Sequence, residues 1–197
     1  MKVYDRIRVN QWFLATIGVL VLTLSCAGVL HGGRATLAAR LSWKAQHGST
    51  APDVELVLDS CRRAFVLYPW NYYLSIYAAE MAYYRADEVK GALHDERIRQ
   101  AELWCGRGLM QNQYRSQLRR LKTRFLWETS PAEAIAYWEA HTNWQYWEPY
   151  NHETLAGLYA KYGEFEKAEA ELKLITNFPE YKTTQTLIKS EKEIWAE

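Results

Sequence analysis

Residues 152–179 read HETLAGLYAKYGEFEKAEAELKLITNFP, and this stretch decides the class of fold. Apolar and small residues recur at helical spacing on both sides of Gly163. Ala156 and Ala168 are small enough to let two antiparallel helices approach closely. Large side chains are available to fill the space between them: Tyr159, Phe165 and Leu172. The stretch therefore predicts a helical hairpin that ends at Pro179.

Similar phrases end other helical segments, which indicates a repeat. Three of them place a proline between two helical stretches: LYPWN at 67–71, WEPYN at 147–151 and NFPEY at 177–181. QNQYR at 111–115 is a degenerate further copy. Proline ends one helix, and Asn71 or Asn151 is then placed to cap the next.

Several residues of the last unit fall on the spacing of a known repeat family: His152, Leu155, Ala156, Tyr159, Ala168, Leu172 and Pro179. The unit resembles a tetratricopeptide repeat, with His152 in place of Trp and Ala156 in place of Gly. This resemblance implies an all-α fold. Residues 52–180 would form a tetratricopeptide-like α-solenoid of antiparallel helical hairpins, and residues 181–197 a C-terminal capping helix.

Earlier units resemble the family one element at a time. Three pairs keep the small-x3-large step of a second helix: Val57 with Cys61, Ala101 with Cys105, and Ala134 with Trp138. First helices are expected at 72–86 and 116–128, although Lys122 stands where the family has a small residue. A capping box at Ser130 and Glu133 predicts a further helix over 131–142.

An uncharged run precedes the repeats. Residues 12–30 read WFLATIGVLVLTLSCAGVL, nineteen residues without a charged side chain. A helix of this length covers roughly 28 Å, close to a hydrocarbon thickness of about 30 Å. We therefore expect residues 12–30 to be a single transmembrane helix. The alternative is a signal peptide that is cleaved after Ala27, with Ser25 as the other small residue of the cleavage site.

Charges on either side of this run do not decide its orientation. Three cations precede it and three follow it within the counting window: Lys2, Arg6, Arg8, Arg34, Arg40 and Lys44. The short tail favours residues 1–11 in the cytoplasm and the repeats in the periplasm, if the membrane is a bacterial inner membrane. His31, Gly32 and Gly33 are expected to end the helix. Residues 31–51 are then a juxtamembrane linker, in which residues 34–47 form either an amphipathic helix on the membrane surface or a helix packed on the repeats.

Charge and motifs exclude several classes of function. Residues 1–51 carry six Lys and Arg against Asp5 alone, while the remainder is slightly acidic, which argues against nucleic-acid binding across the surface. The five His have no metal-ligand spacing, and the chain has no phosphate-binding glycine loop and no G-x-S-x-G motif. We expect no enzymatic activity, no cofactor and no metal.

Two groups of residues are candidates for partner binding. No acid occurs between Glu102 and Glu128, and at 100° per residue the cations there fall on two sides of an apolar stripe: Arg115, Arg119 and Lys122 on one, Arg120 and Arg124 on the other. Because first helices line the concave surface of tetratricopeptide proteins, the resemblance implies that the ridge of Arg115, Arg119 and Lys122 faces a groove suited to an acidic peptide or anionic glycan. A solvated face balanced by neighbouring acids is the alternative.

Aromatic residues gather around the first two proline phrases, and Trp144 and Trp147 are the candidates we select among them. Such residues serve either as core packing or as interface anchors.

We expect a membrane-anchored tetratricopeptide-like scaffold or adaptor that binds other proteins of a membrane complex. The alternatives are a permanent structural subunit of a large membrane assembly and an accessory protein of cell-envelope glycan assembly. The last is suggested by a similarity of the phrases YPWN and EPYN to the repeat tails of O-antigen polymerase and ligase-type proteins.

Overall fold

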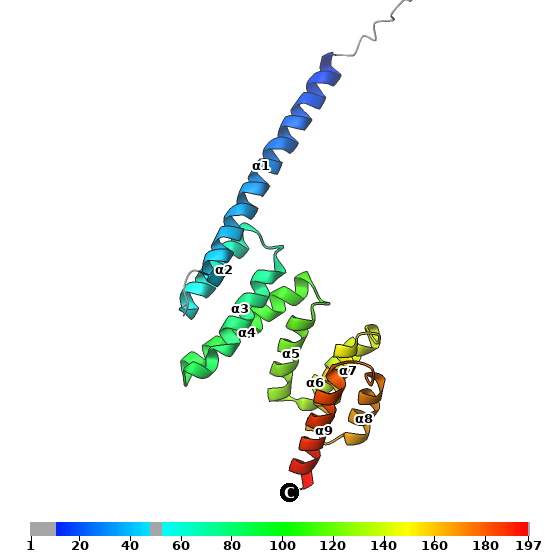
Figure 1. The fold of residues 1–197 in the computed structure, drawn as a ribbon. Helices are drawn as coiled ribbons and strands as arrows, with labels where there is room; N and C mark the ends of the chain where they lie inside the picture. Colours follow the sequence, from blue (N-terminus) through cyan, green and yellow to red (C-terminus); the bar gives the residue numbers. More distant parts are fainter. Residues whose placement is uncertain (1–10, 48–52, 197) are drawn as a thin grey trace, which may run out of the picture. The chain divides into compact units, whose positions relative to one another are not determined.

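The computed structural model describes residues 11–47 and 53–196, and every regular element in these ranges is helical (Figure 1). The prediction of an all-α fold is confirmed. The elements are α1 (Gln11–His47), α2 (Val54–Leu67), α3 (Tyr72–Tyr84), the 3-10 turn η1 (Ala86–Glu88), α4 (Ala92–Gln111), α5 (Ser116–Thr129), α6 (Pro131–Trp144), α7 (Pro149–Lys161), α8 (Phe165–Leu174) and α9 (Glu180–Ala196). They form two compact units, Met1–Ala101 and Glu102–Glu197, with the boundary inside α4.

Helix α1 runs without a break through Gly32 and Gly33, so the expectation that the helix ends there was wrong. Two glycines cost a helix roughly 1 kcal/mol each relative to alanine, which lowers its stability without breaking it. The helix continues because its C-terminal half is packed against α2. Ala38 is buried in that contact, while Leu37 and Trp43 stay exposed.

Helix α2 runs antiparallel to this second half of α1 (Figure 1). The guanidinium of Arg34 donates to the carbonyl of Val66 at 3.3 Å, and the rings of His31 and Tyr68 meet edge to face with centroids 5.4 Å apart. Residues 34–47, for which two alternatives were open, belong to the half of α1 that packs on α2. Residues 48–51 of that predicted linker lie outside the described residues.

Helix α3 follows a four-residue turn and packs on α2. The predicted cap is confirmed, because the side chain of Asn71 accepts a hydrogen bond from the backbone N–H of Tyr73. Alanines at 78, 79 and 82 are fully buried and allow this close contact. The helix ends at Tyr84, two residues before the predicted bound.

The second unit has a core in which α6, α7, α8 and α9 meet (Figure 1). Its buried residues include the family positions named from the sequence: Leu155, Ala156, Tyr159, Ala168 and Leu172. Helices α7 and α8 are antiparallel, because His152 at the start of α7 contacts Glu171 at the end of α8 with 2.6 Å between Nδ1 and Oε2. The predicted start of α6 is confirmed by Ser130, which accepts from the N–H of Glu133.

The prediction that Asn151 caps α7 was wrong. Pro149 occupies the first turn and starts the helix three residues earlier than a cap at Asn151 would, as expected for a residue whose φ is fixed at a helical value. Asn151 is instead buried, and its side-chain amide donates to the carbonyl of Gln145 at 3.1 Å. Its own carbonyl accepts from the indole N–H of Trp138 at 3.0 Å. Asn151 therefore holds the α6–α7 turn in place.

Gly163 is required by the turn between α7 and α8. Its φ is +84°, and a Cβ there would lie 3.1 Å from the ring of Trp195 on α9. We expect Gly163→Ala to lower the free energy of unfolding by about 2 kcal/mol, because backbone strain and steric contact act together. Circular dichroism of thermal unfolding, on the purified chain in detergent, measures this change.

Gly106→Ala is the matched control, because Gly106 is helical and a Cβ there meets nothing within 4 Å. That variant should keep or slightly raise the unfolding midpoint. Equal midpoints for the two variants would contradict the role assigned to the Gly163 turn.

Candidate functional site

Four aromatic rings form an exposed group on the second unit, here called the aromatic cluster: Tyr114, Trp144, Tyr146 and Trp147. Tyr114 and Trp144 are stacked, with centroids 4.1 Å apart and planes 14° from parallel. The ring centroid of Trp147 lies 6.5 Å from that of Trp144 and 5.5 Å from that of Tyr146. Trp147 is 63% exposed and Tyr146 is 68% exposed, so the cluster faces solvent.

Two turns position these rings. Tyr114 lies in the α4–α5 turn, where the side chain of Asn112 accepts from the backbone N–H of Tyr114 at 3.2 Å. Tyr146 and Trp147 lie in the α6–α7 turn, which is held by the hydrogen bond from the Asn151 amide to Gln145. The rings are therefore presented by backbone that is itself hydrogen-bonded.

The predicted ridge of cations is divided between two places. Arg115 directly follows Tyr114, and its Nε donates to the Gln117 side chain at 2.8 Å. Arg119 donates to the carbonyl of Gln113, in the same turn as Tyr114, and its guanidinium lies 5.5 Å from the Tyr137 ring centroid. Arg115 and Arg119 therefore lie close to the α4–α5 turn, which carries Tyr114 of the aromatic cluster.

Lys122 lies further along α5 and faces α4. Its charge lowers the pKa of Cys105, although burial dominates and raises that pKa from 9.0 to about 11. The Cys105 thiol donates to the carbonyl of Leu118 at 3.3 Å. Lys122 is therefore beside the buried Cys105 thiol, and no contact among the described residues joins it to Trp144 or Trp147.

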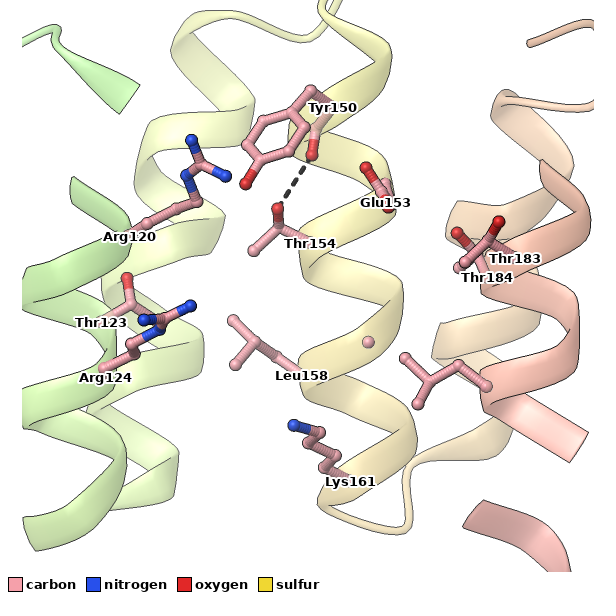
Figure 2. Close-up of a pocket in the computed structure, with 12 residues that line it drawn as sticks. Arg120, Thr123, Arg124, Tyr150, Glu153, Thr154, Leu158, Lys161, Thr183 and Thr184 are labelled. Atoms are coloured by element: carbon pink, nitrogen blue, oxygen red, sulfur yellow. Dashed lines mark hydrogen bonds between the residues drawn. The ribbon is translucent and has the colours of Figure 1, made fainter. Parts of the chain in front are cut away.

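A groove of about 470 Å³ lies between α5, α7 and α9 (Figure 2). Figure 2 shows Arg120 and Arg124 on the α5 wall and Lys161 at one end of α7. Tyr150, Glu153, Thr154 and Leu158 line the α7 wall, and Thr183 and Thr184 face them from α9. None of the candidate cations Arg115, Arg119 and Lys122 lines this groove. The cations of α5 that line it are Arg120 and Arg124, which lie on the other side of the apolar stripe of α5.

Positive charge dominates the groove. Three of its lining residues are cations and only Glu153 is an acid. The Arg120 guanidinium lies 4.7 Å from the centroid of the Tyr150 ring, which holds the charge over that wall. Burial and then the neighbouring charge of Glu180 raise the pKa of Glu153, while Arg120 opposes that rise. The groove has the chemistry to bind a carboxylate or another anion.

Sequence patterns indicate little of this groove, because its walls come from helices about thirty residues apart. Arg120 and Arg124 have the i, i+4 spacing of one helix face, and this was visible. Their proximity to Lys161 and Thr183 depends on how α5, α7 and α9 pack. Within residues 11–47 and 53–196, no group of three or more His, Cys, Asp and Glu is arranged to hold a metal ion.

Comparison with known proteins gives no family and no relative. No family model matches the chain, and no curated protein matches it. No solved structure matches it either.

His141 lies on α6, three residues before Trp144, and gives this part of the unit a dependence on pH. It is buried against Trp138, and among the described residues neither ring nitrogen has a hydrogen-bond partner. Burial, followed by the charge of Arg119, lowers the pKa of His141 from 6.5 to about 4. Between these two values the unfolded chain binds a proton that the folded chain does not, so stability falls as the pH falls.

We expect the free energy of unfolding to fall by about 3 kcal/mol as the pH falls from above 6.5 to near 4, because the unfolded chain binds a proton at His141 that the folded chain does not. His141→Leu should remove that part of the pH dependence and cost little at pH 7, since the ring makes no hydrogen bond there. Urea unfolding at several pH values measures both quantities. The same loss of stability in the variant and the wild type would show that His141 is not the group responsible.

Proposed function

We propose that the chain is a membrane-anchored helical adaptor with tetratricopeptide-like repeats, which binds partner proteins of a membrane complex through its second unit. The observation that carries the proposal is the exposed aromatic cluster beside Arg115 and Arg119. Trp, Tyr and Arg are the residues that most often anchor protein interfaces. Monomeric surfaces seldom expose neighbouring large rings without a partner.

Helix α1 supports the anchoring part of the proposal. It is long and apolar enough to cross a membrane, and the side chains of residues 12–30 are all exposed. Water is a poor solvent for such a surface, whereas a bilayer is a good one. We place α1 in a bacterial inner membrane and the repeats in the periplasm. Anchoring raises the local concentration of the repeats for partners in the same membrane.

Hairpin α7–α8 supports the repeat part. Alanines at the family's close-approach positions are fully buried in it, and its turn uses a glycine with positive φ. Each repeat of this kind leaves side chains on its surface free to acquire specificity, so the partner is set by surface chemistry rather than by fold.

We expect Trp144→Ala combined with Trp147→Ala to abolish or strongly weaken capture of the partner, since interface anchors of this type contribute about 2 kcal/mol or more each. Affinity purification of the full chain from detergent-solubilised membranes, followed by mass spectrometry, measures capture. Phe178→Ala is the control, because Phe178 is also an exposed ring of this unit but lies before α9. Partner recovery that is the same for all three proteins would exclude the aromatic cluster as the interface.

The basic groove is a second contact for an acidic segment of the same partner. Arg120→Glu combined with Arg124→Glu should weaken capture, and the difference from wild type should shrink at high salt because exposed charges are screened. Lys173→Glu on α8, which is exposed and is not one of the residues lining this groove, is the matched charge control. If the double variant and the control retain the same amount of partner at low salt, the groove is not a partner contact.

A further inference from the structure

The turn between α2 and α3 lies level with the point where the uncharged part of α1 ends. The His31–Tyr68 ring contact and the Arg34–Val66 hydrogen bond fix this level. Both α1 residues follow closely on Leu30, the last residue of the uncharged run. The turn is therefore beside α1 at residues 31–34, and not at the far end of α1 near His47.

The rise per residue of α1 gives the depth of this turn relative to the end of the uncharged run. At about 1.5 Å per residue, His31 lies roughly 1.5 Å and Arg34 roughly 6 Å along α1 beyond Leu30. The headgroup layer on each side of the hydrocarbon core is about 5–7 Å thick. If residues 12–30 cross the hydrocarbon, the α2–α3 turn lies at the depth of the headgroups of the leaflet that α1 leaves.

Exposed apolar and aromatic side chains mark this turn. We call residues 66–73 the corner. Val66 is 72% exposed, Trp70 is 74% exposed and Tyr73 is 54% exposed. Tyr72 and Tyr73 are stacked, with centroids 4.4 Å apart. Trp and Tyr favour the membrane–water interface, because one part of each ring system is apolar and another can hydrogen-bond.

Charges near the corner are positive. No acid occurs between residues 60 and 79, and Arg62 and Arg63 lie on the last turns of α2. The acids of α2, Glu55 and Asp59, lie further from the corner, and Asp59 is paired with Arg63 at 2.8 Å, so Arg62 supplies the net positive charge at this end of α2. On α1, residues 31–47 carry cations and no acid. This distribution suits a surface of anionic lipids.

We propose that the corner is a second membrane contact, which inserts Trp70 and its neighbours into the headgroup layer of the bilayer that α1 crosses. This inference rests on the proposed anchoring by α1. With two contacts, unit 1 has a defined orientation on the membrane surface and does not swing freely from a single helix. Arg34 stays close to the backbone of α2 and holds the corner at that depth.

Depth measurement by spin labelling tests the inference in the full chain. The chain, with Cys26→Ser, is reconstituted in vesicles of phosphatidylcholine and phosphatidylglycerol. Val66→Cys places a label in the corner and leaves Trp70 in place, while Asp87→Cys places the control label on the exposed η1, beyond the other end of α3. Cys61 and Cys105 are buried, so a labelling reagent reaches them poorly.

The expected result is that a water-soluble nickel chelate collides several-fold less often with the label at 66 than with the label at 87, whereas oxygen collides more often. Trp70→Glu should raise chelate access at position 66, and Trp70→Phe should leave it low. Equal, water-like access at both positions would overturn the inference.

An alkaline carbonate wash shows whether a negative result means that the corner does not contact the membrane or that α1 does not anchor the chain. If the chain stays in the vesicles after the wash but the label at 66 is fully accessible, α1 is an anchor and the corner is not a membrane contact. If the wash removes the chain, the anchoring by α1 is wrong and the corner inference fails with it.

Discussion

The uncharged run at residues 12–30 is the constraint on which the rest of the first unit depends. Its side chains are exposed over the whole length, so no surface among the described residues removes them from water. The helix that carries this run continues to His47, and α2 packs on that continuation. An apolar segment long enough to cross a membrane and a surface that packs on α2 are thus parts of one continuous helix. A flexible linker would have separated the two roles, and the helical Gly32–Gly33 pair leaves no such linker there.

Close helix contacts in both units are made by alanines. Ala78, Ala79 and Ala82 are fully buried in α3, and Ala156 and Ala160 in α7. An alanine loses no side-chain entropy on burial and lets backbones approach, so larger neighbours can interlock around it. Ridges of large side chains would have kept the helices further apart. The same small side chains, Ala156 and Ala168, are fully buried in the α7–α8 hairpin.

Local signals in the sequence predicted local structure well. Helices α5, α6 and α9 begin and end within about two residues of the expected bounds, and Asn71 and Ser130 act as caps. Errors occurred where two signals competed. Glycines at 32 and 33 indicated a helix end, but packing on α2 outweighed their cost, and Pro149 started α7 before Asn151 could cap it. The groove was missed because it joins side chains from α5, α7 and α9, and spacing within one helix carries no information on that packing.

Two exposed tryptophans lie in proline-containing turns, unlike the tryptophans of the core. Trp104 and Trp138 lie inside helices and are fully buried, whereas Trp70, which follows Pro69, and Trp147, two residues before Pro149, are exposed. A turn between two helices lies on the surface, so a ring that it carries is exposed. The phrases LYPWN and WEPYN therefore do the same thing in the two units, which is to place a Trp outside the core. What differs is the surroundings: the turn that carries Trp70 lies beside α1, where Arg34 donates to Val66, whereas the ring centroid of Trp147 lies 6.5 Å from that of Trp144.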